Sequence, residues 1–283
     1  MRLGNYEVIR QEGGFHSVRD TRSGEVMHSV NDPSVESRAL YIDQIDLASA
    51  LENSDTSPLV IWDVGLGAGT NAMSAITECE TVRARNPLVR RHLHIISFEN
   101  DLDSFRLALR NPSLFPHIHH EAPEQFLADG YWNSSDGLIR WTLMEGDFIT
   151  HIDRADVPDC IFYDMYSAAA NEWLWSADTF TRIFNRCVSR KTRLITYSSS
   201  TQIRSALLAA GFYTGYGARS GPRTDTTIAF NSREAVDPRI TLLGDEWLSR
   251  WNRSSARTSK NLSDEERADI ENRVRNHPQF RQS

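Results

Sequence analysis

The chain has 283 residues, of which 40% are hydrophobic and 24% charged, and its formal net charge is −7 at pH 7. This composition is typical of a globular protein with one sizeable core. It excludes a membrane span, which needs an apolar run of roughly 18 residues, and the N-terminus lacks an apolar signal core. Three scattered cysteines predict reduced thiols, and together these features predict a cytoplasmic protein.

The first 58 residues are expected to pack on the core as a β-hairpin or small meander followed by a helix. Residues 5–29 alternate polar and apolar side chains around two glycine turns, as antiparallel strands do. Asp32 and Pro33 are typical of a helix start, and apolar positions between residues 35 and 51 suit one helix facing the core.

Strands and helices alternate from residue 59 to residue 230. Short apolar strands separated by helical segments predict an α/β fold with a seven-stranded, mostly parallel sheet covered by helices on both faces. The expected strands are 59–64, 94–98, 139–144, 160–163, 193–197, 212–216 and 226–230. The expected helices are 71–80, 102–110, 123–129, 177–188 and 201–210.

The remaining residues, 231–283, are predicted to be a helical tail. Trp247, Leu248 and Trp251 have helical spacing, which favours an amphipathic helix docked on the domain. The alternative is a lobe that faces the substrate, because Trp251 lies among basic residues.

A glycine-rich turn joins the first strand of the domain to its helix. Gly65, Gly67 and Gly69 alternate after Asp63, but Thr70 stands where the dinucleotide fingerprint needs its third glycine. No Gly-Lys pair follows, which excludes a phosphate-binding P-loop. The pattern suits S-adenosylmethionine, whose amino-acid end and sulfonium can lie against the turn near Asp63. A plain tight turn is the alternative if the glycines are taken alone.

Acidic residues follow the next two strands. Ligands of such sheets bind at the carboxyl ends of the strands, where Glu99 and Asp147 are expected. A carboxylate has two acceptor oxygens, so Glu99 can hold both ribose hydroxyls, and Asp147 can take the adenine amino group. The combination strengthens the prediction of S-adenosylmethionine as cofactor.

A candidate catalytic segment follows the fourth strand and begins at Asp164. Methyl transfer to nitrogen needs an oriented, neutral amine and an acceptor for its proton, and a carboxylate at the end of a strand can supply both. Tyr166, Trp173 and Trp175 can stack on a planar substrate, although tryptophans at these positions are equally typical of a core.

Two stretches resemble the bacterial tRNA 5-methylaminomethyl-2-thiouridine methyltransferase family. Gly67-Ala68-Gly69-Thr70-Asn71 stands where that family has Gly-Thr-Gly-Leu-Asn. The segment from Asp164 to Trp175 resembles its signature Asp-Gly-Phe-Ala-Pro-x-x-Asn-Pro-x-x-Trp, with Asn171 kept and Tyr166 in place of Phe. The resemblance implies a class I methyltransferase fold, with Asp164 beside the amine. The residues that we assign to the cofactor are Asp63, Gly65, Gly67, Gly69, Asn71, Glu99 and Asp147.

The chain also departs from the family pattern. Both signature prolines are replaced, by Ala168 and Glu172, and Met165 replaces the small residue after the acid. The chain is too short for the flavin oxidase half of the bifunctional members, so another enzyme is expected to supply the aminomethyl-uridine.

The basic residues are unevenly distributed. Segment 179–224 carries eight basic residues and no acidic one, and segment 250–260 is a second acid-free group. A polyanion such as tRNA could dock there despite the net charge, although solvated helix faces would give the same pattern. The expected substrate-binding residues are Tyr166, Asn171, Trp175, Arg182, Arg204 and Arg219.

Three functions therefore remain open from the sequence. The first is N-methylation of the aminomethyl group of a wobble uridine in tRNA, and the second is methylation of a small molecule or a protein by the same fold. The third is a cofactor-binding interaction protein without catalysis. No metal is expected, because the histidines of segment 117–120 lack cysteine or carboxylate partners in the sequence and read as a polar loop.

Overall fold

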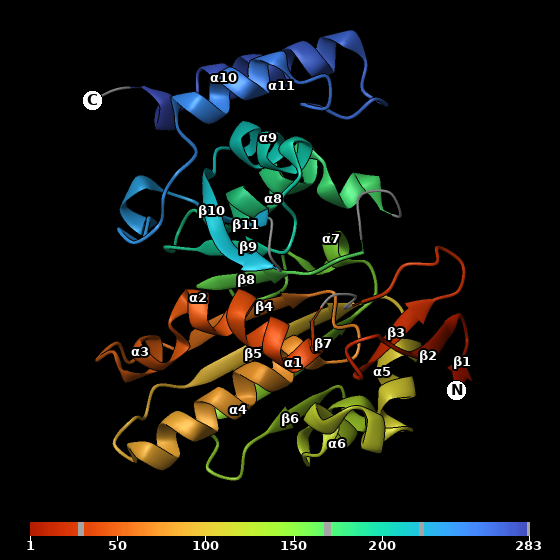
Figure 1. Cartoon of the computed structure of the whole chain (residues 1–283). Helices are drawn as coiled ribbons and strands as arrows, with labels where there is room; N and C mark the ends of the chain where they lie inside the picture. Colours follow the sequence, from red (N-terminus) through yellow and green to blue (C-terminus); the bar gives the residue numbers. More distant parts are fainter. Residues whose placement is uncertain (28–30, 167–170, 221–223, 282–283) are drawn as a thin grey trace. The chain divides into compact units, whose positions relative to one another are not determined.

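The computed structural model describes residues 1–27, 31–166, 171–220 and 224–281 (Figure 1). The chain separates into two compact units, residues 1–166 and residues 167–283. The sequence predicts a different division, into an N-terminal segment 1–58, a cofactor-binding domain 59–230 and a tail 231–283. That division stays a prediction. Among the described helices, none is long and apolar enough to cross a membrane.

The first unit begins with the small antiparallel sheet expected from the sequence. Its strands lie in the order β1 (Arg2–Leu3), β2 (Tyr6–Arg10) and β3 (His16–Asp20). Tyr6 stands opposite Asp20, and Val8 stands opposite Val18. Tyr6 and Val18 are buried, so one face of this sheet packs against the rest of the unit.

The helix expected over residues 35–51 is broken, which corrects the prediction of one continuous helix. Asp32 caps its start by accepting hydrogen bonds from the backbone of the first turn. A left-handed residue, Asp46 (φ +50°), interrupts it and caps the next helix through Ser49 N. The pieces are α1 (Pro33–Ser37), the π-helical η1 (Arg38–Ile42), α2 (Asp43–Ile45) and α3 (Leu47–Glu52).

The main sheet of the first unit has the strand order β8-β4-β5-β7-β6. Its bounds are β4 (Leu59–Val64), β5 (Leu93–Glu99), β6 (Tyr131–Asn133), β7 (Ile139–Glu145) and β8 (Cys160–Tyr163). The four strands expected from the sequence pair in parallel, whereas β6 pairs with β7 antiparallel. The short strand β6 was not expected, and with it the described residues of the two units hold eight strands outside the N-terminal sheet, instead of seven.

Helices cover both faces of this sheet. Their bounds are α4 (Thr70–Arg85), α5 (Asp103–Leu109), η2 (Pro112–Leu114), η3 (Pro116–Ile118), α6 (Ala122–Asp129) and α7 (Phe148–His151). Trp141 of β7 meets Phe105 of α5 and Phe126 of α6 on one face. Trp62 of β4, which alternates to the opposite face, meets Phe148 of α7.

The described residues of the second unit form three antiparallel strands in the order β9-β11-β10. Their bounds are β9 (Arg193–Thr196), β10 (Tyr213–Ser220) and β11 (Thr224–Phe230). The helices are η4 (Glu172–Trp175), α8 (Ala177–Cys187), α9 (Thr201–Ala210), η5 (Arg233–Ala235), α10 (Asp245–Arg253), α11 (Asp264–Arg275) and η6 (Pro278–Phe280). The helix expected over residues 201–210 forms α9, and Gly211 ends it in the left-handed conformation (φ +105°).

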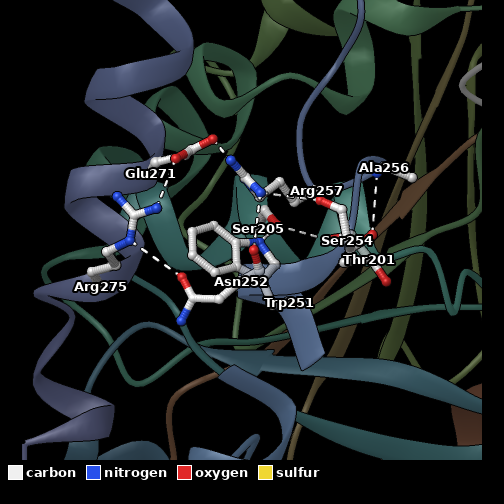
Figure 2. Close-up of polar contacts among 9 residues, drawn as sticks. All are labelled: Thr201, Ser205, Trp251, Asn252, Ser254, Ala256, Arg257, Glu271 and Arg275. Carbon is white, nitrogen blue, oxygen red and sulfur yellow. Dashed lines mark hydrogen bonds and ion pairs between the residues drawn. The ribbon is translucent and has the colours of Figure 1, made fainter. Parts of the chain in front are cut away.

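The tail docks within the second unit, where α11 packs on α9. Figure 2 shows the contact: Trp251 of α10 donates its indole N–H to Ser205 Oγ of α9 at 2.6 Å. The guanidinium groups of Arg257 and Arg275 lie 5.8 and 5.5 Å from the Trp251 ring, and Glu271 of α11 pairs with both arginines. Trp251 and Arg257 therefore serve the docking of the tail, as the first of the two interpretations of the sequence expected.

The outer edge of β10 is also covered by the tail. Tyr216 N donates to Thr241 O, and Leu243 N donates to Thr214 O. Gln279 of η6 completes the cover, because its side chain accepts from Thr214 N at 2.7 Å and donates to Thr214 O at 2.8 Å.

Candidate active site

The glycine turn lies between β4 and α4 in the first unit. Gly65, Gly67 and Gly69 all have positive φ, at +93°, +55° and +80°. A Cβ on Gly65 would lie 2.7 Å from the backbone oxygen of Asp164, and one on Gly69 would lie 2.6 Å from the Phe105 ring. Packing inside the protein therefore explains these two glycines, in addition to the turn itself.

Asp63, at the end of β4, is fully buried beneath this turn. Its Oδ2 accepts a 2.6 Å hydrogen bond from Ser97 Oγ, which in turn accepts from Trp141 Nε1 at 2.8 Å. Burial raises the pKa of Asp63 to about 7 against the lowering effect of Ser97, and the charges of Asp164 and Glu99 add to the rise. Its other oxygen, Oδ1, has no hydrogen-bond partner among the described residues.

Asp164 follows β8 and is tied directly to α4. Asn71, in the first turn of α4, donates its Nδ2 to Asp164 Oδ2 at 2.6 Å. Asn71 is 4% exposed, and its Oδ1 has no hydrogen-bond partner within the described part of the chain. The two residues that carry the family resemblance at separate places in the sequence are thus in direct contact.

Glu99 ends β5 and faces the glycine turn. Its carboxylate accepts from Gly67 N at 3.3 Å, from Asn100 N at 2.9 Å and from Asp101 N at 3.0 Å. Burial raises its pKa, while these backbone donors act in the opposite direction. Asp147 is exposed and caps α7 by accepting from Ile149 N, so one of its oxygens already has a structural role.

The site fits a ligand that brings hydrogen-bond donors and positive charge. Two buried oxygens, Asp63 Oδ1 and Asn71 Oδ1, lack partners among the described residues, and a buried acceptor without a partner is costly. Ammonium and sulfonium groups bring positive charge, which suits the neighbouring carboxyl groups of Asp63, Glu99 and Asp164. The amino-acid end of S-adenosylmethionine would be held near Asp63 and Asn71, and its ribose near Glu99.

His117 is a contact of this site that the sequence prediction missed. Its Nε2 donates to the carbonyl oxygen of Ala68 at 3.0 Å and lies 3.4 Å from Thr70 Oγ1. A histidine in a segment that the sequence predicts to be a polar loop carries no signal that it supports a turn nearly 50 residues earlier. Among the described side chains, no group of three His, Cys, Asp or Glu residues could hold a metal ion.

In the first unit, the structure brings Asp63, the glycine turn, Asn71, Glu99 and Asp164 together, whereas Asp147 caps α7. In the second unit, it places two of the expected residues in the interior. Trp175 is 1% exposed and packs edge-on against Phe180 and Tyr197, so it belongs to the core rather than to an open stacking surface. Asn171 precedes η4, and its carbonyl accepts from Leu174 N.

Arg204 is also buried, which contradicts its expected contact with a substrate. It donates to Thr227 Oγ1 and to the carbonyl oxygens of Asp225 and Thr226, and it lies over the Tyr216 ring. Arg204 belongs to the basic segment 179–224 that the sequence predicts as a binding surface, yet its guanidinium binds the backbone of the protein itself.

The other expected arginines are exposed. Arg219 pairs with Asp225 at 3.0 Å, although its side chain is 72% exposed. Arg182 is exposed on α8. These two keep their predicted place in a surface that could contact phosphates.

Comparison with known proteins agrees with this geometry. Residues 120–232 match a protein family described as S-adenosyl-L-methionine-dependent methyltransferase. A crystal structure of MNMC2 from Aquifex aeolicus has a TM-score of 0.70 over 97% of this chain and 84% of its own, at 23% identity, which shows the shared fold. The chain is a methyltransferase of the class I fold that uses S-adenosylmethionine as its cofactor.

The curated relatives confirm the resemblance found in the sequence. The chain is 26% identical over 241 residues to the tRNA 5-methylaminomethyl-2-thiouridine biosynthesis bifunctional protein MnmC of Burkholderia vietnamiensis. The matched region covers 81% of this chain and 33% of that protein. Its counterpart in Delftia acidovorans is 28% identical over 68% of this chain and 30% of its own length. The chain therefore spans about a third of the length of these relatives.

Proposed function

We propose that this methyltransferase methylates the amino nitrogen of an aminomethyl-uridine at the wobble position of tRNA. The observation that carries the proposal is the 2.6 Å bond between Asn71 and Asp164 beside the glycine turn. It joins the two motifs of the resemblance in one site. The names of the curated relatives, which refer to tRNA 5-methylaminomethyl-2-thiouridine biosynthesis, support this acceptor. A tRNA acceptor also agrees with the predicted cytoplasmic location.

Asp164 would act on the acceptor amine. When bound, S-adenosylmethionine supplies a methyl group activated by the positive charge on its sulfur. Asn71 holds Asp164 Oδ2, which fixes the direction of the carboxylate. Asp164 can then accept a hydrogen bond from the amine, orient its lone pair and take up the proton that the amine loses. Only a neutral amine has the lone pair, so the rate of transfer should rise with pH until the amine is deprotonated.

Labelled methyl transfer to tRNA that carries unmethylated aminomethyl-uridine tests the proposal. We expect label in tRNA and, after nuclease digestion, in a single modified uridine. Asp164→Asn should lower the rate at least about 100-fold while the cofactor still binds, because loss of a general base typically costs that much. Intact cofactor binding without label in tRNA would refute the tRNA acceptor.

The alternative acceptor is a small molecule or a protein. It is favoured by the burial of Trp175 and Arg204, which removes two of the side chains expected to contact RNA. Label in metabolites or protein but not in RNA would identify it. A protein that binds the cofactor without catalysis would show no transfer to any nucleophile, with or without Asp164→Asn.

A further inference from the structure

Within the second unit, one carboxylate joins the segment that follows Asp164 in the chain to the tail. Glu172 begins η4, and its Oε1 accepts from Ser259 Oγ while its Oε2 accepts from Asn261 Nδ2. These two donors lower the pKa of Glu172, which keeps both oxygens available as acceptors at neutral pH. The turn between α10 and α11 is thus bound to η4 by both oxygens of one side chain.

Glu172 stands where the family signature has its second proline. Proline fixes φ and restrains the backbone without any partner. Glutamate lacks this restraint, and at this position its bonds to the tail hold the side chain in one place. A restraint that is local in the family signature is therefore replaced here by a tertiary contact, which makes the tail part of the support of η4.

Trp173, the next residue, is exposed although its backbone is held. Its carbonyl oxygen accepts from Thr179 Oγ1 at 2.8 Å and from Ser176 N at 3.2 Å. The residue is 49% exposed, whereas the other six tryptophans, all within the described part of the chain, are buried. An indole ring open to water on a fixed backbone is suited to stacking on a nucleobase.

The tail brings positive charge to the same contact. Lys260 is exposed and stands between the two residues that bind Glu172. Arg250 and Arg253, in the last turn of α10, are exposed as well. None of these three side chains forms an ion pair with a described residue, so all three can meet phosphates. Charge complementarity therefore favours RNA as the occupant of this surface.

We propose that Trp173 and Lys260 form a subsite for a nucleotide of the tRNA, and that Glu172 builds this subsite by holding the tail to η4. Trp173 stacks on a base and Lys260 pairs with a phosphate, which is the combination that binds single-stranded nucleic acid. Glu172 is a positioning residue, because it acts on the RNA through the tail. The proposal rests on the tRNA function proposed above and adds the tail to the RNA-binding surface.

Binding of tRNA to the full chain, measured by fluorescence anisotropy with S-adenosylhomocysteine present, tests the subsite. Trp173→Ala should weaken the affinity about tenfold, and Trp173→Phe should stay within about threefold because an aromatic ring remains. Lys260→Gln should weaken binding about threefold and reduce the slope of log affinity against log salt by about one.

Two exposed residues of the first unit serve as matched controls. Tyr131 is 45% exposed on β6, and Arg85 is exposed at the end of α4 that lies away from the glycine turn. Tyr131→Ala and Arg85→Gln should each change the affinity for tRNA by less than about 1.5-fold, because neither belongs to the proposed subsite.

Glu172→Ala separates positioning from charge. Removal of a negative charge beside bound RNA would by itself strengthen binding. Loss of the contact with the tail should instead weaken binding about fivefold and raise the KM for tRNA while kcat is kept. In a background with Ser259→Ala and Asn261→Ala the same change should weaken binding less than about 1.5-fold, because nothing remains for Glu172 to position. Calorimetric binding of S-adenosylmethionine should be the same in all these variants.

The proposal is overturned if Trp173→Ala binds tRNA as tightly as the wild type does. It is also overturned if Glu172→Ala binds tRNA as tightly as the wild type, or more tightly. If the wild type transfers label to tRNA and the variants bind tRNA as it does, only the subsite is refuted. If the wild type neither binds nor methylates tRNA, the proposed function fails and the subsite fails with it.

Discussion

Replacing Asp63 with asparagine removes an ionisable group from the centre of the first unit. Asp63 is fully buried, and Ser97 is the donor to its Oδ2. Burial raises the pKa of this carboxyl from 3.8 to about 7. The folded protein therefore keeps a proton on Asp63 over a pH range in which the unfolded chain has lost it.

The sign and size of the effect follow from this difference. Between pH 3.8 and about 7 the folded state binds one more proton than the unfolded state, so the Asp63 contribution lowers the free energy of unfolding as pH rises. The change is about 1.4 kcal/mol per pH unit, or about 4 kcal/mol in total. Above pH 7 the destabilisation is present in full, and below pH 3.8 it is absent. Asparagine cannot ionise, so Asp63→Asn should lack this contribution.

Urea denaturation of the wild type and of Asp63→Asn at pH 5, 6, 7 and 8 measures the contribution of Asp63 to the free energy of unfolding. The difference between the two free energies of unfolding should shift by about 3 kcal/mol in favour of the variant from pH 5 to pH 8. At pH 8 the free energy of unfolding of the variant should exceed that of the wild type by only about 1–3 kcal/mol. This is less than the full contribution of Asp63, because the new amide leaves a buried N–H without a partner. Asp129→Asn, at an exposed position at the end of α6, controls for the substitution itself. A pH-independent difference between wild type and Asp63→Asn would refute the reasoning.

Three further substitutions test contacts described above. Gly65→Ala should destabilise the protein by about 3 kcal/mol and abolish cofactor binding in calorimetry, because its Cβ would strike the Asp164 backbone at a positive φ. Arg204→Ala should cost about 2–4 kcal/mol in urea denaturation yet leave the salt dependence of tRNA binding unchanged, since its hydrogen bonds are internal. Trp251→Phe, which loses the bond to Ser205, should cost about 1–2 kcal/mol in the same assay while cofactor binding is kept.

Most of the regular elements could be predicted from the sequence. Strand β4 and the turn after it were found because an apolar run ending in alternating glycines leaves few other conformations. The strand ends also indicated where Glu99 and Asp164 would lie, because neighbouring parallel strands end at the same edge. The break at Asp46 was missed, since apolar spacing continues across it and a single left-handed residue has no clear signal when it is not glycine.

The environment of single side chains could not be predicted in the same way. Trp175 and Arg204 belong to the interior of the second unit, and nothing in the local sequence distinguishes a buried arginine from an exposed one. The contact of Met27 with Gly67 joins residues 40 positions apart and depends on how the N-terminal sheet packs on α5. Such contacts are tertiary, so they required the three-dimensional structure.

The tail segment along β10 has a consequence for the behaviour of the protein at high concentration. A strand at the edge of a sheet offers unpaired N–H and C=O groups to strands of other molecules, which promotes aggregation. Gln279 takes up both backbone groups of Thr214, and Thr241 accepts from Tyr216 N. One glutamine side chain thus imitates a peptide unit of an additional strand, and it occupies the two Thr214 backbone groups that a strand of another chain would otherwise bind.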